Sequence, residues 1–231
     1  MGHFWYSSML LSFVMHAPSL YFQRVLEDAK IASGWDRMQR PLLTMHIRHG
    51  DSCSELQESL TMRHCEPLSV YMETAVLPMW RRCAFCSKKI RKTSTNVRNL
   101  FGVYNRYGIK SIFLATDDDA VLEDIKAWPM FTWHVVPGLD RGELKKAHWD
   151  SNLRQKKFDS FFEAQAALVD LFLMSEGDAF VGKFTSNLDR IAYSLLVGKK
   201  QGLVPYASLD STWCMDWGMP AGKSIYGNFH C

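Results

Sequence analysis

The stretch FDSFFEAQAALVDLFLMSEGDAFVGKFTSNLDRIAYSLLVG, residues 158–198, decides the fold class of this chain. Residues 158–177 have the apolar spacing of an amphipathic helix, and residues 178–184 form an apolar run of strand length. Residues 186–198 predict a second helix, ended by Gly198. A helix, a strand and a helix in close succession are typical of chains that alternate the two elements around a parallel sheet.

The same alternation extends outward from this stretch along most of the chain. We expect helices over 67–80, 97–108 and 119–128, and strands over 41–47, 111–116, 131–137 and 203–208. Crossover helices join parallel strands, so we predict an α/β fold: a Rossmann-like parallel sheet with flanking helices. We assign linking helices to residues 1–38, the sheet domain to 39–206 and an irregular tail rich in Cys, Trp and Gly to 207–231.

Composition and charge exclude several classes of protein. The 231 residues are 47% hydrophobic and 13% aromatic, which excludes a disordered chain. The net charge of +3 is far below that of a typical nucleic-acid binder, so we expect no nucleic-acid partner. Residues 1–19 lack the basic start of a signal peptide and are too short and polar to span a membrane, so we expect a helix there, with Pro18 starting the next one.

The cysteines predict disulfide bonds more readily than a metal site. Cys53 and Cys65 bracket a short loop that they could close. Cys83 and Cys86 have the spacing of half a zinc site, but no second pair of that spacing follows. With Cys214 and Cys231 the count is six, which leaves the pairing open.

Polar residues follow three of the predicted strands, where ligands of parallel sheets bind. The first group is His46-Ile47-Arg48-His49-Gly50-Asp51. Arg48 suits a phosphate or carboxylate ligand, and a structural ion pair with Asp117 or Asp118 explains it equally well. The sequence contains neither GxGxxG nor GxxxxGK[ST], which disfavours an NAD-binding protein and a P-loop NTPase.

The other groups also have two interpretations each. Residues 185–187, Thr-Ser-Asn, precede a helix and predict either an anion site or a simple N-cap. The run 117–119, three aspartates, predicts either a divalent-cation site or helix capping with an ion pair to Arg48. Asp170 lies within an apolar helix, where it either faces solvent or accepts hydrogen bonds from a guanine edge.

Three segments in this order resemble the α-1,6-fucosyltransferase family: HIRHGD (46–51), LATDDDAVLEDIK (114–126) and ALVDLFLMSEGDAFVGKFTSNLDRIAYSL (167–195). FVMHAP (13–18) resembles the link between that family's two domains, and the resemblance covers about residues 1–200. It implies the carboxyl-terminal, nucleotide-binding half of a GT-B glycosyltransferase. Such an enzyme is inverting, needs no metal or other cofactor, and uses GDP-fucose as donor.

The resemblance also implies roles for individual residues. Arg48 would bind the β-phosphate and offset the charge of the leaving diphosphate. Asp117 and Asp118 would orient Arg48 or line the sugar site. The remaining donor-binding residues would be His46 and Asp170 at the guanine, and Thr185, Ser186 and Asn187 at phosphate.

The chain departs from the family pattern at three places. His49 replaces the second Arg of the motif, and Ser52 replaces a Lys. Leu56 stands where the animal enzyme has its catalytic glutamate, so the general base is expected among Glu55, Glu58 and Asp51, of which we favour Glu55. Protein O-fucosyltransferase activity, a metal-dependent transferase and a non-catalytic GDP- or glycan-binding fragment stay open as alternatives. The resemblance further implies a glycan or glycoprotein acceptor, protein N-glycosylation, and a place in the Golgi or secretory lumen, with membrane attachment only through an anchor outside this chain.

Overall fold

The computed structural model describes residues 3–16, 18–49, 65–76, 108–138, 160–210, 220–224 and 227–230. Its centre is a five-stranded sheet in the order β3-β2-β1-β4-β5. The strands are β1 (Leu42–Ile47), β2 (Ser111–Thr116), β3 (Thr132–His134), β4 (Ala179–Gly182) and β5 (Tyr206–Ser208). Every neighbouring pair is parallel, so the predicted α/β fold with a parallel sheet is confirmed.

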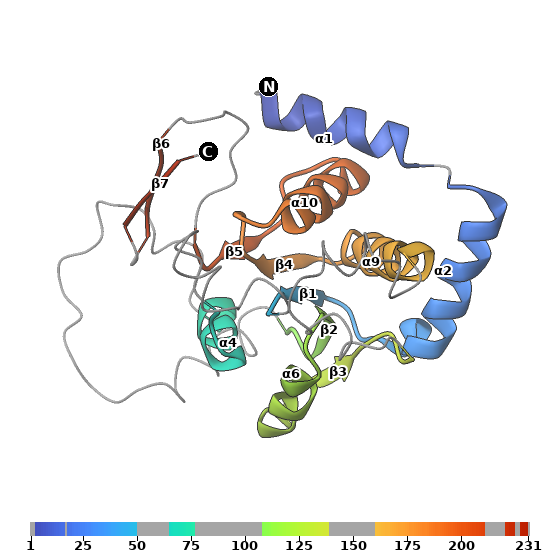
Figure 1. Cartoon of the computed structure of the whole chain (residues 1–231), viewed down its shortest axis with the longest axis horizontal. Helices are drawn as coiled ribbons and strands as arrows, with labels where there is room; N and C mark the ends of the chain where they lie inside the picture. The colour runs from blue at the N-terminus through green and yellow to red at the C-terminus, as the bar shows by residue number, and fades with distance from the viewer. Residues whose placement is uncertain are drawn as a thin grey trace.

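Helices cover both faces of this sheet (Figure 1). On one side lie α1 (His3–Val14), α2 (Leu20–Ser33), α9 (Ser160–Met174) and α10 (Asn187–Lys200). On the other lie α4 (Leu68–Val76) and α6 (Asp119–Asp124), and single 3-10 turns span Trp35–Arg37 and Ile125–Ala127. Because both faces are buried, the central strands β1 and β2 are buried at every position, which explains their continuous apolar runs.

Alternate residues of β1 enter two separate cores. Leu42 packs with Phe113, Phe180 and Tyr193 beneath α9 and α10. Leu43, Met45 and Ile47 face the α4 and α6 side. His46 is two and four residues from Thr44 and Leu42, so its side chain belongs to the α9–α10 face, at the carboxyl end of the strand.

Gly198 does not end its helix, and this prediction is wrong. α10 continues to Lys200 and is capped by Gln201 in the left-handed region. A Cβ on Gly198 would lie 2.5 Å from the Ser8 carbonyl oxygen and 2.5 Å from Ser12 Cβ, both on α1. The glycine therefore serves a close crossing of α1 over α10.

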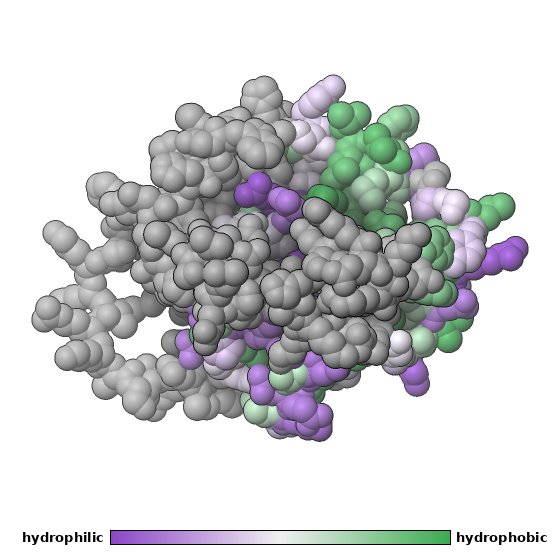
Figure 2. Space-filling model, viewed as in Figure 1, coloured by the Kyte–Doolittle hydropathy of each residue, from purple (hydrophilic) through white to green (hydrophobic). Residues whose placement is uncertain are grey.

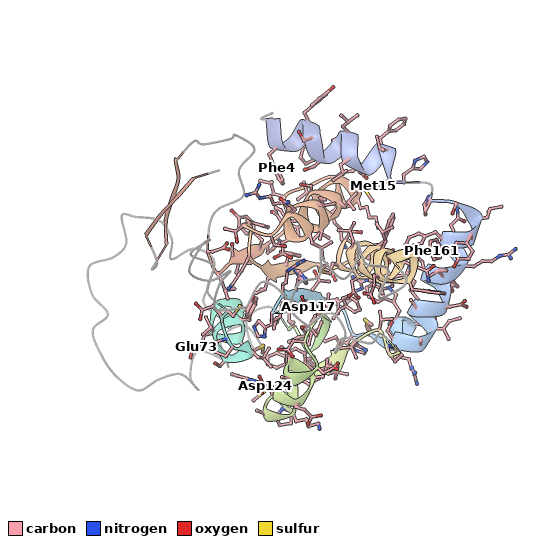
Figure 3. The ribbon with its side chains drawn as sticks, viewed as in Figure 1. Phe4, Met15, Glu73, Asp117, Asp124 and Phe161 are labelled. Atoms are coloured by element: carbon pink, nitrogen blue, oxygen red, sulfur yellow. The ribbon has the colours of Figure 1, made fainter. Side chains whose placement is uncertain are left out.

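α1 is apolar on both of its sides. Phe4 and Met15 lie along the side that packs on the sheet domain, as Figure 3 shows at its two ends. The other side exposes Tyr6, Leu10, Phe13 and Val14. Figure 2 shows apolar residues gathered over this part of the visible face.

Two further predictions differ in detail from the structure. The second helix begins at Leu20 rather than at Pro18, because Ser19 is its N-cap and accepts a hydrogen bond from Phe22 N–H. The tail contains an antiparallel pair, β6 (Pro220–Ser224) and β7 (Gly227–His230), where we expected irregular chain. The helix expected over 97–108 lies outside the described residues except for Gly108.

Candidate functional site

Polar side chains from four strand ends and two helix starts meet at the carboxyl edge of the sheet. This edge is formed by the ends of β1, β2, β4 and β5, together with the amino ends of α6 and α10. Figure 3 shows Asp117 at the end of β2, in the middle of the molecule. Ligands of parallel α/β sheets bind at this edge, so the predicted strand-end residues stand where such a ligand is expected.

A buried histidine–aspartate pair links β1 to α10. His46 Nδ1 and Asp189 Oδ1 form a hydrogen bond in which the ring nitrogen donates. The second carboxylate oxygen of Asp189 accepts from Lys183 N–H at 2.7 Å. His46 is 5% exposed and Asp189 is 1% exposed. Nδ1 is committed to Asp189, so Nε2 is the ring nitrogen left for other partners.

Opposing effects set the charge of this pair. Burial lowers the pKa of His46, but the charge and hydrogen bond of Asp189 outweigh burial and leave the pKa of His46 above its ordinary value. The Asp117 carboxylate adds to this rise, and the Arg48 cation opposes it. Burial also raises the pKa of Asp189, although the pairing with His46 works in the other direction. The pair therefore favours an imidazolium against a carboxylate in a dry environment.

His49 is fixed by three contacts, all to the same edge. Its backbone N–H donates to Asp117 Oδ1 at 2.7 Å. Its ring lies between Asp118 Oδ2, 3.2 Å from Nδ1, and the Glu66 carbonyl oxygen, 2.8 Å from Nε2. These contacts fix the ring of His49 at the position where the resembled family motif has its second Arg.

The aspartate run after β2 is used for capping and for His49. Asp118 is the N-cap of α6 and accepts from Ala120 N–H at 3.0 Å. Asp119 is exposed in the first turn of the same helix. Among the described residues, no group of three or more His, Cys, Asp or Glu side chains is arranged to hold a metal ion.

Arg48 is an exposed cation at this edge. It follows directly after Ile47, the last residue of β1, and its side chain is exposed. It stands between His46 and His49 in the sequence, and its charge acts on His46. An accessible guanidinium beside two histidines with carboxylate partners makes this part of the edge suited to an anionic ligand.

The three predicted phosphate ligands lie between β4 and the first residue of α10, and they differ in their hydrogen bonds and exposure. Thr185 donates its hydroxyl hydrogen to Asp210 Oδ2 at 2.5 Å, and Ser208 donates to the other oxygen of Asp210 at 3.0 Å. Ser186 is the N-cap of α10 and accepts from Asp189 N–H at 3.4 Å, which leaves its own hydrogen available for donation. Asn187 is exposed at the first position of the helix.

Tyr71 and Lys183 contact each other close to the acids of this edge. Tyr71 on α4 is 1% exposed, and the Lys183 ammonium lies 5.9 Å from its ring centroid. Burial raises the pKa of Tyr71 well above its ordinary value, and the nearby charges of Asp189 and Asp210 add to the rise. The phenol therefore stays protonated.

Of the other predicted site residues, the structure describes Asp170 but neither Asp51 nor Glu55. Asp170 is 8% exposed within α9. It lies four residues before Met174, about 6 Å by helical rise from the helix end that leads to the opposite edge of the sheet. Its contact with guanine stays a prediction. Asp51 and Glu55, the expected general bases, lie outside the described residues.

Sequence reasoning missed three acidic residues of this edge. They are Asp189, Asp210 and Glu66, whose Oε1 is buried without a hydrogen bond to a described residue. The pattern Ser186-x-x-Asp189 is that of a capping box with Asp in place of Glu, so a helix start was visible, but not the partner of the carboxylate. Asp210 comes shortly after the last predicted strand of the sheet, just as the other candidate site residues follow their strands.

Cys65 takes part in a disulfide bond. The other five cysteines lie outside the described residues, so its pairing with Cys53 stays a prediction. None of the described helices is both long and apolar enough to cross a membrane.

Comparisons with known proteins give a likeness of fold. No family model and no curated protein sequence matches the chain. Similar solved structures include POFUT1 in complex with GDP, with 16% identity, a TM-score of 0.39, and coverage of 80% of this chain and 47% of that one. POFUT1 in complex with GDP-fucose has 15% identity, a TM-score of 0.40 and coverage of 82% and 46%.

A third similar structure is NodZ alpha-1,6-fucosyltransferase soaked with GDP-fucose, with 15% identity, a TM-score of 0.37 and coverage of 77% and 42%. The chain thus spans less than half the length of each of these proteins. Identities of 15–16% and TM-scores of 0.37–0.40 do not assign the chain to a family.

Proposed function

We propose that the chain binds GDP-fucose at the carboxyl edge of its sheet and belongs to an enzyme that transfers fucose to a glycan hydroxyl. The observation that carries this proposal is the grouping of Arg48, His46 and His49 with the amino end of α10. It combines an exposed guanidinium, the His46 imidazole oriented by a carboxylate, the His49 segment held by Asp117 and Asp118, and a helix N-terminus, which together suit a diphosphate. These residues are also the ones that carry the motif resemblance.

The chemistry at this site is a displacement with inversion. The acceptor hydroxyl oxygen forms a bond to fucose C1 while the bond from C1 to the β-phosphate oxygen breaks, and GDP leaves with the electron pair. Arg48 offsets the charge that grows on the diphosphate. The hydroxyl proton passes to a carboxylate, for which Asp51 and Glu55 are the predicted candidates.

The linkage and the acceptor are the finer part of the proposal. The segments resembling α-1,6-fucosyltransferases favour that linkage on an N-glycan, formed in a secretory compartment. Protein O-fucosyl transfer uses the same donor, so the donor-binding residues alone do not separate the two acceptors. If the tests show binding of GDP or a glycan but no transfer, the proposal is limited to a binding protein.

The test is calorimetry of the full chain with GDP, GDP-fucose and, as a matched control, UDP. We expect GDP and GDP-fucose to bind and UDP to bind at least about tenfold more weakly, since one lost base-specific hydrogen bond to a polar site has about that effect. His46→Gln should reduce this preference, since His46 is the predicted guanine contact at this edge. Equal binding of UDP, or no binding of GDP, would contradict the nucleotide assignment.

Transfer is measured separately with a panel of N-glycan and protein acceptors and a chelator in the buffer. Chelator-resistant release of GDP that depends on an acceptor supports the proposed enzyme. Binding of GDP without release of product from any acceptor would support the binding protein instead.

A further inference from the structure

A buried carboxylate occupies the first turn of the helix that faces the proposed ligand. Asp189 is the third residue of α10, and its side chain turns back toward the sheet. An anion at this place competes with a phosphate for the same helix terminus unless its charge is matched. The partner that matches it is His46, which comes from β1, 143 positions earlier in the chain.

We propose that Asp189 is a positioning residue for nucleotide binding: it holds the Nδ1–H of His46, so that Nε2 of the ring is presented to GDP at the carboxyl edge. This rests on the proposed function, since GDP is the ligand named there. Asp189 itself does not touch the nucleotide.

The surroundings of Asp189 leave its carboxylate one place to lie. One oxygen contacts His46 Nδ1 and the other accepts from Lys183 N–H at 2.7 Å. The main chain of Asp189 is held by the Ser186 cap. A Cβ on Gly182 would lie 2.7 Å from Asp189 Oδ2, so the strand has a glycine where the carboxylate approaches it. The Lys183 N–H, the Ser186 cap and the space left by Gly182 thus hold the Asp189 carboxylate where it meets His46.

The charges around His46 agree with a cationic ring. Asp189 on α10 and Asp117 after β2 favour the imidazolium, and Arg48 on its own strand and burial oppose it. The net effect is a pKa of His46 above its ordinary value. A protonated Nε2 is a donor, which suits the acceptor atoms of a guanine edge or a phosphate and repels none of them.

The first readout is the protonation of the His46 ring nitrogens, and its deciding result comes from the wild-type chain. In the full chain labelled with ¹⁵N, the ring nitrogens of His46 should show a protonated Nδ1 throughout pH 6–8, and Asp189→Asn should shift the titration of His46 to lower pH. An Nδ1 without its proton in the wild-type chain would overturn the proposal, even if the variant does not fold.

The second readout is GDP affinity measured across pH 6–9. Wild-type affinity should fall as the pH rises through the titration of His46, and Asp189→Asn should weaken binding about tenfold at neutral pH and move that fall to lower pH. Asp178→Asn is the matched control, because Asp178 is also an acid at a strand end but pairs with Arg40 and Lys200 at the opposite edge of the sheet. It should leave the affinity and the pH profile unchanged.

The outcomes separate the two proposals. If the wild-type chain binds no GDP, the proposed function fails, while the ring-nitrogen signals still decide whether Asp189 holds His46. If GDP binds and Asp189→Asn has the wild-type affinity and pH profile, the positioning role is wrong and the proposed function stands.

Discussion

The two edges of one sheet place their charges in different ways. At the amino edge, Asp178 binds Arg40 at 2.9 Å and Lys200 at 2.7 Å, and Glu176 binds Lys30 at 2.9 Å. These are long basic side chains, paired directly with acids and partly exposed. At the carboxyl edge, Asp189 and Asp118 are buried, and their partners are histidine rings and backbone N–H groups.

This difference separates stability from ligand binding. Pairs of Lys or Arg with an acid at the amino edge satisfy one another, so they hold the strand ends together and leave little charge for a ligand. At the carboxyl edge, a buried acid holds His46 through Nδ1 and leaves Nε2 for another partner, and the exposed Arg48 adds a cation. Substitutions matched across the two edges test this contrast.

The largest expected effect comes from the two arginines that flank β1. Arg48→Ala should weaken GDP binding by about 10- to 100-fold, because it removes a charge-assisted contact to phosphate. Arg40→Ala should leave GDP binding unchanged and lower the free energy of unfolding by about 1 kcal/mol, since Arg40 pairs with Asp178 while partly exposed. Calorimetry and urea denaturation measure the two quantities. Loss of GDP binding in Arg40→Ala would erase the contrast between the edges.

Two glycines give a second matched pair. A Cβ on Gly177, at the amino edge, would lie 2.6 Å from the Thr44 side chain, and one on Gly182 would lie 2.7 Å from Asp189 Oδ2. Each substitution by Ala should destabilise the fold by about 1–3 kcal/mol through overpacking. Only Gly182→Ala should also weaken GDP binding, because only it displaces Asp189. Equal GDP affinities in the two folded variants would argue against this.

Asp178 should make the free energy of unfolding depend on pH in the acid range. Although burial alone would raise its pKa, hydrogen bonds from Lys200, Leu42 N–H and Arg40 lower the pKa of Asp178 from 3.8 to about 2. The stabilisation is therefore present above pH 3.8 and is lost as the pH falls through about 2.

Asp178→Asn should lower the free energy of unfolding at pH 7 by about 1–2 kcal/mol, after allowing for solvent screening. The difference from wild type should shrink as the pH falls from 4 to 2. The exposed Asp124→Asn, on α6, is the control and should have no such dependence. A constant difference across this pH range would mean that the ion pairs of Asp178 are not its source.

The smallest effect is expected at Lys30. Its pair with Glu176 is partly exposed, so Lys30→Ala should lower the free energy of unfolding by only about 0.5 kcal/mol. This difference should disappear in high salt, which screens exposed pairs. A loss that persists in salt would assign the effect to the contact of Lys30 with the Trp35 ring instead.

The sheet could be predicted because burial on both faces leaves a local mark. The runs at 111–116 and 41–47 are apolar almost throughout, and they match β2 and β1 within one residue. Strands at the sides of the sheet are shorter than predicted: β3 covers Thr132–His134 of the expected 131–137. Pairing with a single neighbour or with short neighbours limits their length, and the sequence of one strand does not contain that information.

Part of the candidate site could be predicted by the same logic. Parallel strands end at one edge, so Arg48, Asp117 and Thr185 were expected near one another from their positions after strands. The partner of each side chain could not be predicted. His49 contacts Asp117 through its backbone N–H and Asp118 through its ring, and Thr185 donates to Asp210.

The sequence by itself determined the alternation of helices and strands, and with it the edge at which a ligand would bind, because apolar periodicity is a local property. Only the tertiary structure decided how that edge is charged. His46 and Asp189 are 143 residues apart, and their pairing depends on the β1–β4 register and on the glycine at 182 that lets the carboxylate approach. Such a pair forms only when the chain has excluded water around both groups, and no local pattern encodes that condition.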